Sequence, residues 1–81
     1  MDQPKGIAMP HVIIKMHTGR SEEQKAQLTK TIVEDIMAIL SCKEEVISVA
    51  IQDVLPSQWE EEVYKPDILD ASVKLYKKPG Y

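Results

Sequence analysis

The chain of 81 residues contains one cysteine, three glycines, one tryptophan and no phenylalanine. The lone cysteine, Cys42, excludes a disulfide within the chain, and the few glycines form no phosphate-binding loop. No apolar run is long enough for a signal peptide or a membrane span. We therefore predict a cytoplasmic protein with no membrane partner, in which Cys42 is a buried thiol rather than a nucleophile.

Positive charge is scarce as well. Ten Lys and Arg residues against thirteen Asp and Glu residues give a net charge of -3, and the basic residues are scattered, so no nucleic-acid partner is expected. Zinc-type Cys and His spacing and the glycine-flanked serine of hydrolases are missing, so no metal site is predicted. A chain this short buries only a modest part of its surface, which favours oligomerisation.

The first nine residues mix Pro, Gly, Asp and Lys without periodicity. This composition predicts a flexible leader over residues 1–9, followed by a single domain over residues 10–81. The domain opens with the segment 10–17, where a β-branched run follows a proline at the first position, which a strand tolerates. We therefore predict that the first strand begins at Pro10.

A long helix is predicted next. Ser21 and Gln24 match a capping box, so the helix is expected to begin at Ser21 and to extend to Ser41. Apolar residues at three- and four-residue spacing form one stripe along it: Leu28, Ile32, Val33, Ile36, Ile39 and Leu40. The segment 46–54 is short and nearly continuous in apolarity, which predicts a second strand that is buried on both faces.

A strand, a helix and a strand in succession form a β-α-β unit, whose strands are parallel with a right-handed crossover. Ser57 is expected to cap a second helix, and Pro66 to start or kink a further helical segment to about Lys77. The fold class is thus α+β, with a C-terminal helical segment. Because so small a sheet has open edges, we expect a homo-oligomer, most simply a dimer that completes the sheet.

Two parts of the chain carry a family resemblance. Met9-Pro10-His11 at the head of the first strand, followed by the segment 18–25, resembles the start of the 4-oxalocrotonate tautomerase family. The segments 56–59 and 77–81 are similar to the dimeric phenylpyruvate-type branch of that family. The resemblance implies a β-α-β tautomerase fold in which the initiator methionine is removed. It also implies that the exposed proline, as a general base, moves a proton in an enol or keto acid, without a cofactor.

The covalent state of Pro10 decides whether this chemistry is possible. A terminal amine has an intrinsic pKa of roughly 8, which partial burial and nearby cations lower, so free base is present near neutrality. An internal proline nitrogen is an amide and has no basic lone pair. Residues 1–9 could reflect an upstream start, a removable pro-segment or a permanent extension that silences the site. The last case corresponds to a non-enzymatic oligomeric binding module.

Further site residues follow from the resemblance one at a time. Arg20 matches an arginine that binds a substrate carboxylate, as its planar fork suits. Ser48 stands where the family has a second arginine, so a small monocarboxylate such as an arylpyruvate is favoured over a diacid. Trp59 matches an aromatic wall that lowers the polarity of the site. A hydratase, dehalogenase or decarboxylase of the same superfamily is the alternative activity.

Three polar residues of the first strand remain. His11 and His17 are separated by an even number of positions and therefore share a face. His11, next to Pro10, is a candidate for tuning the amine or contacting substrate. Lys15 could replace the missing second arginine, but a strand-edge lysine that deters aggregation is the favoured interpretation.

Overall fold

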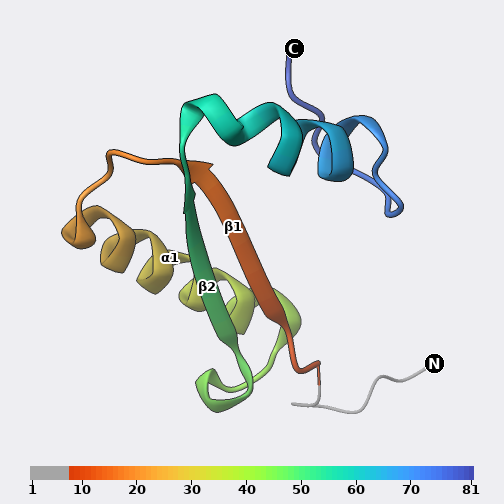
Figure 1. The fold of residues 1–81 in the computed structure, drawn as a ribbon. Helices are drawn as coiled ribbons and strands as arrows, with labels where there is room; N and C mark the ends of the chain where they lie inside the picture. The colour runs from red at the N-terminus through yellow and green to blue at the C-terminus, as the bar shows by residue number, and fades with distance from the viewer. Residues whose placement is uncertain (1–7) are drawn as a thin grey trace. The chain divides into compact units, whose positions relative to one another are not determined.

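The computed structural model describes residues 8–81, so the leader predicted over residues 1–9 lies outside it apart from Ala8 and Met9. Along the chain the elements are strand β1 (His11–His17), helix α1 (Glu22–Leu40), a 3₁₀ helix (Glu44–Val46), strand β2 (Ser48–Val54), a second 3₁₀ helix (Pro56–Gln58) and a π-helix (Glu60–Leu69). The predicted β-α-β unit with a C-terminal helical segment is confirmed (Figure 1).

The described residues form two compact units. The first contains residues 8–14 and Gly19–Gln52, which include the start of β1, all of α1 and most of β2. The second contains Lys15–Thr18 and Asp53–Tyr81, which include the ends of both strands and the segment that follows β2.

β1 and β2 are neighbours in one two-stranded sheet. At its beginning, the Ser48 amide donates to the Pro10 carbonyl at 3.2 Å. At its other end, the Thr18 amide donates to the Val54 carbonyl at 3.1 Å. Both strands therefore start at the same end of the sheet, and the predicted parallel pairing is confirmed (Figure 1).

α1 has the predicted capping box. The Gln24 amide donates to the Ser21 hydroxyl oxygen at 3.1 Å, and the Ser21 amide donates to the Gln24 side-chain oxygen at 3.0 Å. The helix ends at Leu40, and Ser41 follows in the left-handed region at φ 56°. Both predicted ends are confirmed, because the signals that set them lie within a few residues of each end.

Replacing the capping serine tests this start. Ser21→Ala removes one acceptor of an otherwise unpaired helix amide and should lower the free energy of unfolding by about 1 kcal/mol in urea denaturation. Ser57→Ala is the matched control, because Ser57 is exposed and follows Pro56 within a 3₁₀ helix. Equal effects of the two substitutions would show that the capping box does not stabilise α1.

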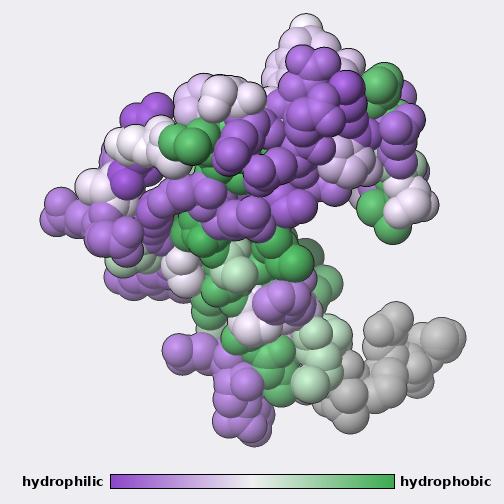
Figure 2. Space-filling view, viewed as in Figure 1, coloured by the Kyte–Doolittle hydropathy of each residue, from purple (hydrophilic) through white to green (hydrophobic). Residues whose placement is uncertain are grey.

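One face of the sheet lies against α1. Val49 and Ile51 of β2 are half-buried on that face, together with Val12 and Ile14 of β1, whereas Ile13, on the opposite face, is 58% exposed. Figure 2, viewed from the side opposite α1, shows hydrophobic atoms over the two strands. The prediction that the second strand is buried on both faces is wrong for the single chain, because a β-α-β unit has one helix for a sheet with two faces.

Two further expectations for this unit need correction. β2 begins at Ser48 rather than Val46, which belongs to the preceding 3₁₀ helix. The apolar stripe of α1 is only partly covered: Ile39 is 77% exposed and Leu40 is 50% exposed.

The segment after β2 differs most from the prediction. Pro56 begins the 3₁₀ helix one residue before Ser57, as proline favours the first helical position, so Ser57 caps no helix. Pro66 lies inside the π-helix, which ends at Leu69. No further helix continues to Lys77. The Asp70 amide donates to the carbonyl of Lys65, five residues earlier, at 2.9 Å, which is the spacing of a π turn.

The second unit has its own small core. Val54 at the end of β2 and Val63 of the π-helix are 2% and 5% exposed. On the exposed side of the π-helix, a hydrogen bond to Glu61 and the attraction of that carboxylate raise the pKa of Lys65 above its usual value. Among the described residues, no helix has the length and apolarity to cross a bilayer.

Candidate active site

Among residues 8–81, Pro10 is the first that takes part in the pairing of the two strands. It is half-buried, and its carbonyl accepts the hydrogen bond from the Ser48 amide. Met9, immediately before it, is 65% exposed and has a φ of 49°, in the left-handed region that residues with a Cβ rarely adopt. The peptide bond between these residues thus lies between exposed Met9 and the residue just before β1, whose carbonyl pairs with β2.

His11 and Ser48 form a pair beside Pro10. The Nδ1 atom of His11 lies 2.6 Å from the hydroxyl oxygen of Ser48, across the two strand starts. Both side chains are exposed. The sequence predicted each as a separate substrate contact, and the structure brings them together because parallel strands place their first residues at the same end.

Arg20 lies beyond the opposite end of β1. It follows Gly19, whose φ of 120° would strain any other residue although a Cβ there would meet nothing within 4 Å. Arg20 is exposed, and its guanidinium forms no hydrogen bond or ion pair with any described residue. The Gly19 turn therefore presents an unpaired guanidinium at the N-terminal end of α1.

A single copy of the chain separates Pro10 from Arg20. The strand between them, β1, has seven residues, and at about 3.3 Å per residue it spans roughly 20 Å. The two residues lie at opposite ends of it (Figure 1). An arginine side chain and a small acid do not bridge that distance, so the structure does not bring these two predicted residues into one site within one copy.

Trp59 belongs to the second compact unit. It immediately precedes the π-helix, is half-buried, and meets the ring of His17 edge-on with 4.8 Å between ring centroids. In the same unit the Lys15 ammonium pairs with Asp67 at 2.6 Å. The Lys15 charge is therefore paired with a carboxylate within the chain, which does not favour Lys15 as a replacement for the missing arginine. Its interpretation as a strand-edge lysine stays a prediction.

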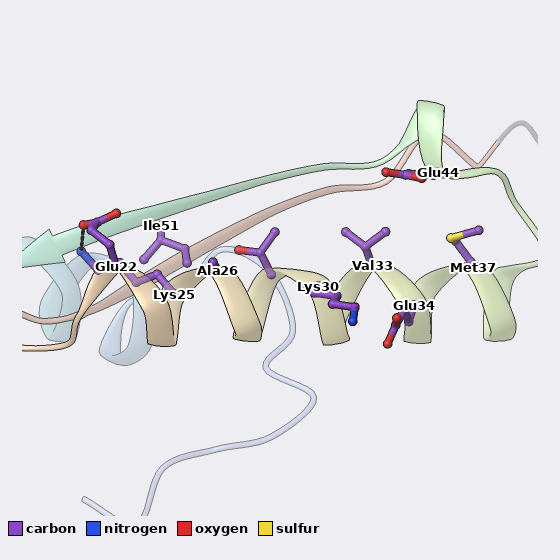
Figure 3. Close-up of a pocket in the computed structure, with 10 residues that line it drawn as sticks. Glu22, Lys25, Ala26, Lys30, Val33, Glu34, Met37, Glu44 and Ile51 are labelled. Carbon is purple, nitrogen blue, oxygen red and sulfur yellow. Dashed lines mark hydrogen bonds and ion pairs between the residues drawn. The ribbon is translucent and has the colours of Figure 1, made fainter.

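A groove of about 890 Å³ lies between α1 and β2 in the first unit. Figure 3 shows Ala26, Val33 and Met37 of α1 and Ile51 of β2 directed into the space between the two elements. None of the predicted site residues lines it. Its lining combines these apolar side chains with charged residues such as Lys30, Glu34 and Glu44.

Two predictions about reactive groups can be compared with the structure. Cys42 is a free thiol and only 6% exposed, so the expected buried thiol is confirmed. Over residues 8–81, no group of three or more His, Cys, Asp or Glu side chains could hold a metal ion. The groups at the strand starts are the amide nitrogen of Pro10, the imidazole of His11 and the hydroxyl of Ser48. An amine is present there only when the Met9–Pro10 bond is absent.

The chain is similar to proteins of one family. A family described as "Tautomerase enzyme" matches residues 10–62. Tautomerase PptA from Pectobacterium carotovorum is 40% identical over 79 residues, covering 90% of this chain and 97% of that protein. A protein named "Probable tautomerase" from Xylella fastidiosa is 40% identical over 73 residues, covering 90% and 89% of the two chains.

Solved structures show the same relationship. One, from work on the 4-oxalocrotonate tautomerase isozymes of Methylibium petroleiphilum, has a TM-score of 0.59 at 30% identity and covers 62% of this chain and 81% of that chain. Another, YwhB, a homologue of 4-oxalocrotonate tautomerase, has a TM-score of 0.55 at 35% identity and covers 57% and 75%. The chain belongs to the tautomerase family and is an enzyme of the isomerase class.

Proposed function

We propose that the protein interconverts the enol and keto forms of a small 2-oxo acid, with the amine of Pro10 as general base once residues 1–9 are removed. The observation that carries this proposal is that the family match and the pairing of the sheet both begin at Pro10. Met9 is 65% exposed, so the Met9–Pro10 bond lies next to an accessible residue.

The freed amine can carry both halves of the reaction. As free base it removes a proton from the carbon next to the carbonyl, and the resulting ammonium returns that proton to the oxygen, so no proton is gained or lost overall. A terminal amine has an intrinsic pKa of roughly 8, so some of it is present as free base near neutral pH. No cofactor takes part in these steps.

Arg20 binds the substrate carboxylate in this proposal, and it does so from a second copy of the chain. The seven residues of β1 separate Arg20 from Pro10 of the same copy. The apolar sheet face around Ile13 and the exposed end of α1 at Ile39 supply surface for the contact between copies. We therefore propose a homodimer whose two sites each use residues from both chains.

Trp59 is the apolar wall of the site in this proposal. Its edge-on contact with His17 fixes the plane of the indole, and its partial exposure leaves a ring face for substrate. A ring in that role favours a substrate with an aromatic group, as in the phenylpyruvate-type branch. We also propose a cytoplasmic location, since the chain has a single cysteine, Cys42, which is buried and in no disulfide within the chain.

The substrate class gives a first test. A site with Ser48 in place of a second arginine lacks one charge-assisted hydrogen bond worth about 1.5–3 kcal/mol, so kcat/KM for phenylenolpyruvate should exceed that for an enol dicarboxylate by roughly 10- to 100-fold. Ultraviolet absorbance follows both reactions with the chain that begins at Pro10. Equal values for the two acids would contradict the assignment of a monocarboxylate.

A further inference from the structure

We propose that His11 is a catalytic residue that donates a hydrogen bond from Nε2 to the substrate oxygen beside Pro10, and that Ser48 is its positioning residue. This inference rests on the proposed function, because it assigns the group that stabilises charge while Pro10 removes the proton. The observation behind it is the 2.6 Å contact between the Ser48 hydroxyl and Nδ1 of His11.

Ser48 is held at two points, which makes it a suitable support. Its amide donates to the Pro10 carbonyl at 3.2 Å. Its hydroxyl oxygen contacts the imidazole of His11, the residue that follows Pro10. Ser48 of β2 thus holds both the backbone of Pro10 and the imidazole of His11. Consecutive Cα atoms are about 3.8 Å apart, so the imidazole is carried within reach of a substrate bound at the amine.

The hydrogen bond is compatible with the form of the ring that the proposal needs. When the Ser48 hydroxyl donates to Nδ1, a neutral His11 carries its hydrogen on Nε2 and presents a donor to the site. Both side chains are exposed, so Nε2 is accessible to a small molecule. His11 therefore supplies a donor at the end of the sheet where the chain has a serine instead of a second arginine.

The electron movement shows where such a donor acts. Pro10 takes a proton from the carbon next to the carbonyl, the C–H electron pair forms the carbon–carbon double bond, and the carbonyl π pair moves to the oxygen. A donor aimed at that oxygen stabilises it more as negative charge develops than in the neutral substrate. The Pro10 ammonium then protonates the oxygen, and His11 keeps its own hydrogen throughout.

Kinetics of variants in the chain beginning at Pro10 test the pair. That chain retains every described helix and strand. His11→Ala should lower kcat roughly 10²-fold with little change in KM, since the donor acts in the transition state. His11→Gln, whose amide nitrogen lies near the position of Nε2, should recover part of the loss, whereas His11→Asn, whose amide reaches only the Nδ1 position, should not.

Ser48 variants separate positioning from a structural role. Ser48→Ala should lower kcat about 3- to 10-fold, because one neutral hydrogen bond is lost. Ser48→Thr keeps the hydroxyl and should therefore retain the original kcat. In a His11→Ala background, Ser48→Ala should have no further effect on kcat. Ser72→Ala, at an exposed serine of the second unit, is the matched control for loss of a hydroxyl.

Failure of this assignment is distinguishable from failure of the proposed function. Full tautomerase activity that is insensitive to His11→Ala, or equal kcat for the Gln and Asn variants, would overturn the role of His11 and leave Pro10 untouched. Additive effects of His11→Ala and Ser48→Ala would overturn the positioning role of Ser48. A folded Pro10-start chain without tautomerase activity would overturn both proposals.

Discussion

A chain that begins at Pro10 is expected to convert phenylenolpyruvate to phenylpyruvate about 10²- to 10⁴-fold faster, in kcat/KM, than the same chain with residues 1–9 attached. The reason is covalent: with Met9 attached, the Pro10 nitrogen is an amide without a basic lone pair. Removing nine residues leaves β1, α1 and β2 complete, so folding is not the variable. Ultraviolet absorbance of enol and keto forms gives both rates.

Two control chains separate chemistry from obstruction. A chain that begins at Ala8 carries only two residues before Pro10, so it should be as slow as the full chain because its Pro10 nitrogen is still acylated. Pro10→Ala in the shortened chain leaves a primary amine of different basicity and shape and should fall between the two extremes. If the Ala8 chain were as fast as the Pro10 chain, Pro10 would not be the base.

Mixing two defective chains should regenerate activity, because each proposed site takes Pro10 from one copy and Arg20 from another. One chain begins at Pro10 and carries Arg20→Ala; the other has Arg20 but keeps residues 1–9. After joint unfolding and refolding in equal amounts, about a quarter of the sites should combine both intact residues, whatever the size of the symmetric oligomer. About a quarter of the normal rate should then return.

The separate chains define the background for this mixture. Arg20→Ala alone should raise KM for phenylenolpyruvate and lower kcat/KM roughly 10- to 100-fold, through loss of a charge-assisted hydrogen bond to the carboxylate. Its free energy of unfolding should change by less than about 0.5 kcal/mol, because Arg20 is exposed and unpaired among the described residues. If the refolded mixture gained no activity, Pro10 and Arg20 would not come from different copies.

The sequence predicts the β-α-β unit well because its signals are local. The proline just before β1 and the pairing of Ser21 with Gln24 act within a few residues, and the start of α1 follows from the Ser21–Gln24 pair. The segment after β2 is governed differently. Pro66 was expected to start or kink a helix, but the choice of a π-helix depends on how the whole turn packs around Val63, which local propensity does not specify.

The candidate site shows the same division. The sequence shows the types and positions of Pro10, His11 and Ser48. It does not show the contact between His11 and Ser48, because these residues are separated by 37 positions. One signal could have found it: each strand of a parallel pair begins with a polar residue at the same end. The ion pair of Lys15 with Asp67, separated by 52 positions, has no such signal.

The sequence overestimates the burial of the β-strands and of α1, because it does not show that a single copy covers only one face of the sheet. The near-continuous apolarity of β2 describes the strand in its final surroundings, and one copy provides cover on only one face. Ile13 on the open face and Ile39 at the end of α1 are exposed in the single chain. Apolar residues that one copy leaves exposed indicate an assembly of several copies. They do not specify which surfaces of those copies are in contact.

The role of Pro10 is tested most directly by the mass of the chain that carries tautomerase activity when the protein is made from its own gene. Purification is followed by activity, and the intact mass of the active species is then determined. The expected mass is that of a chain beginning at Pro10. A fully active species whose mass retains residues 1–9, and with them the Met9–Pro10 peptide bond, would contradict the assignment of Pro10 as the base.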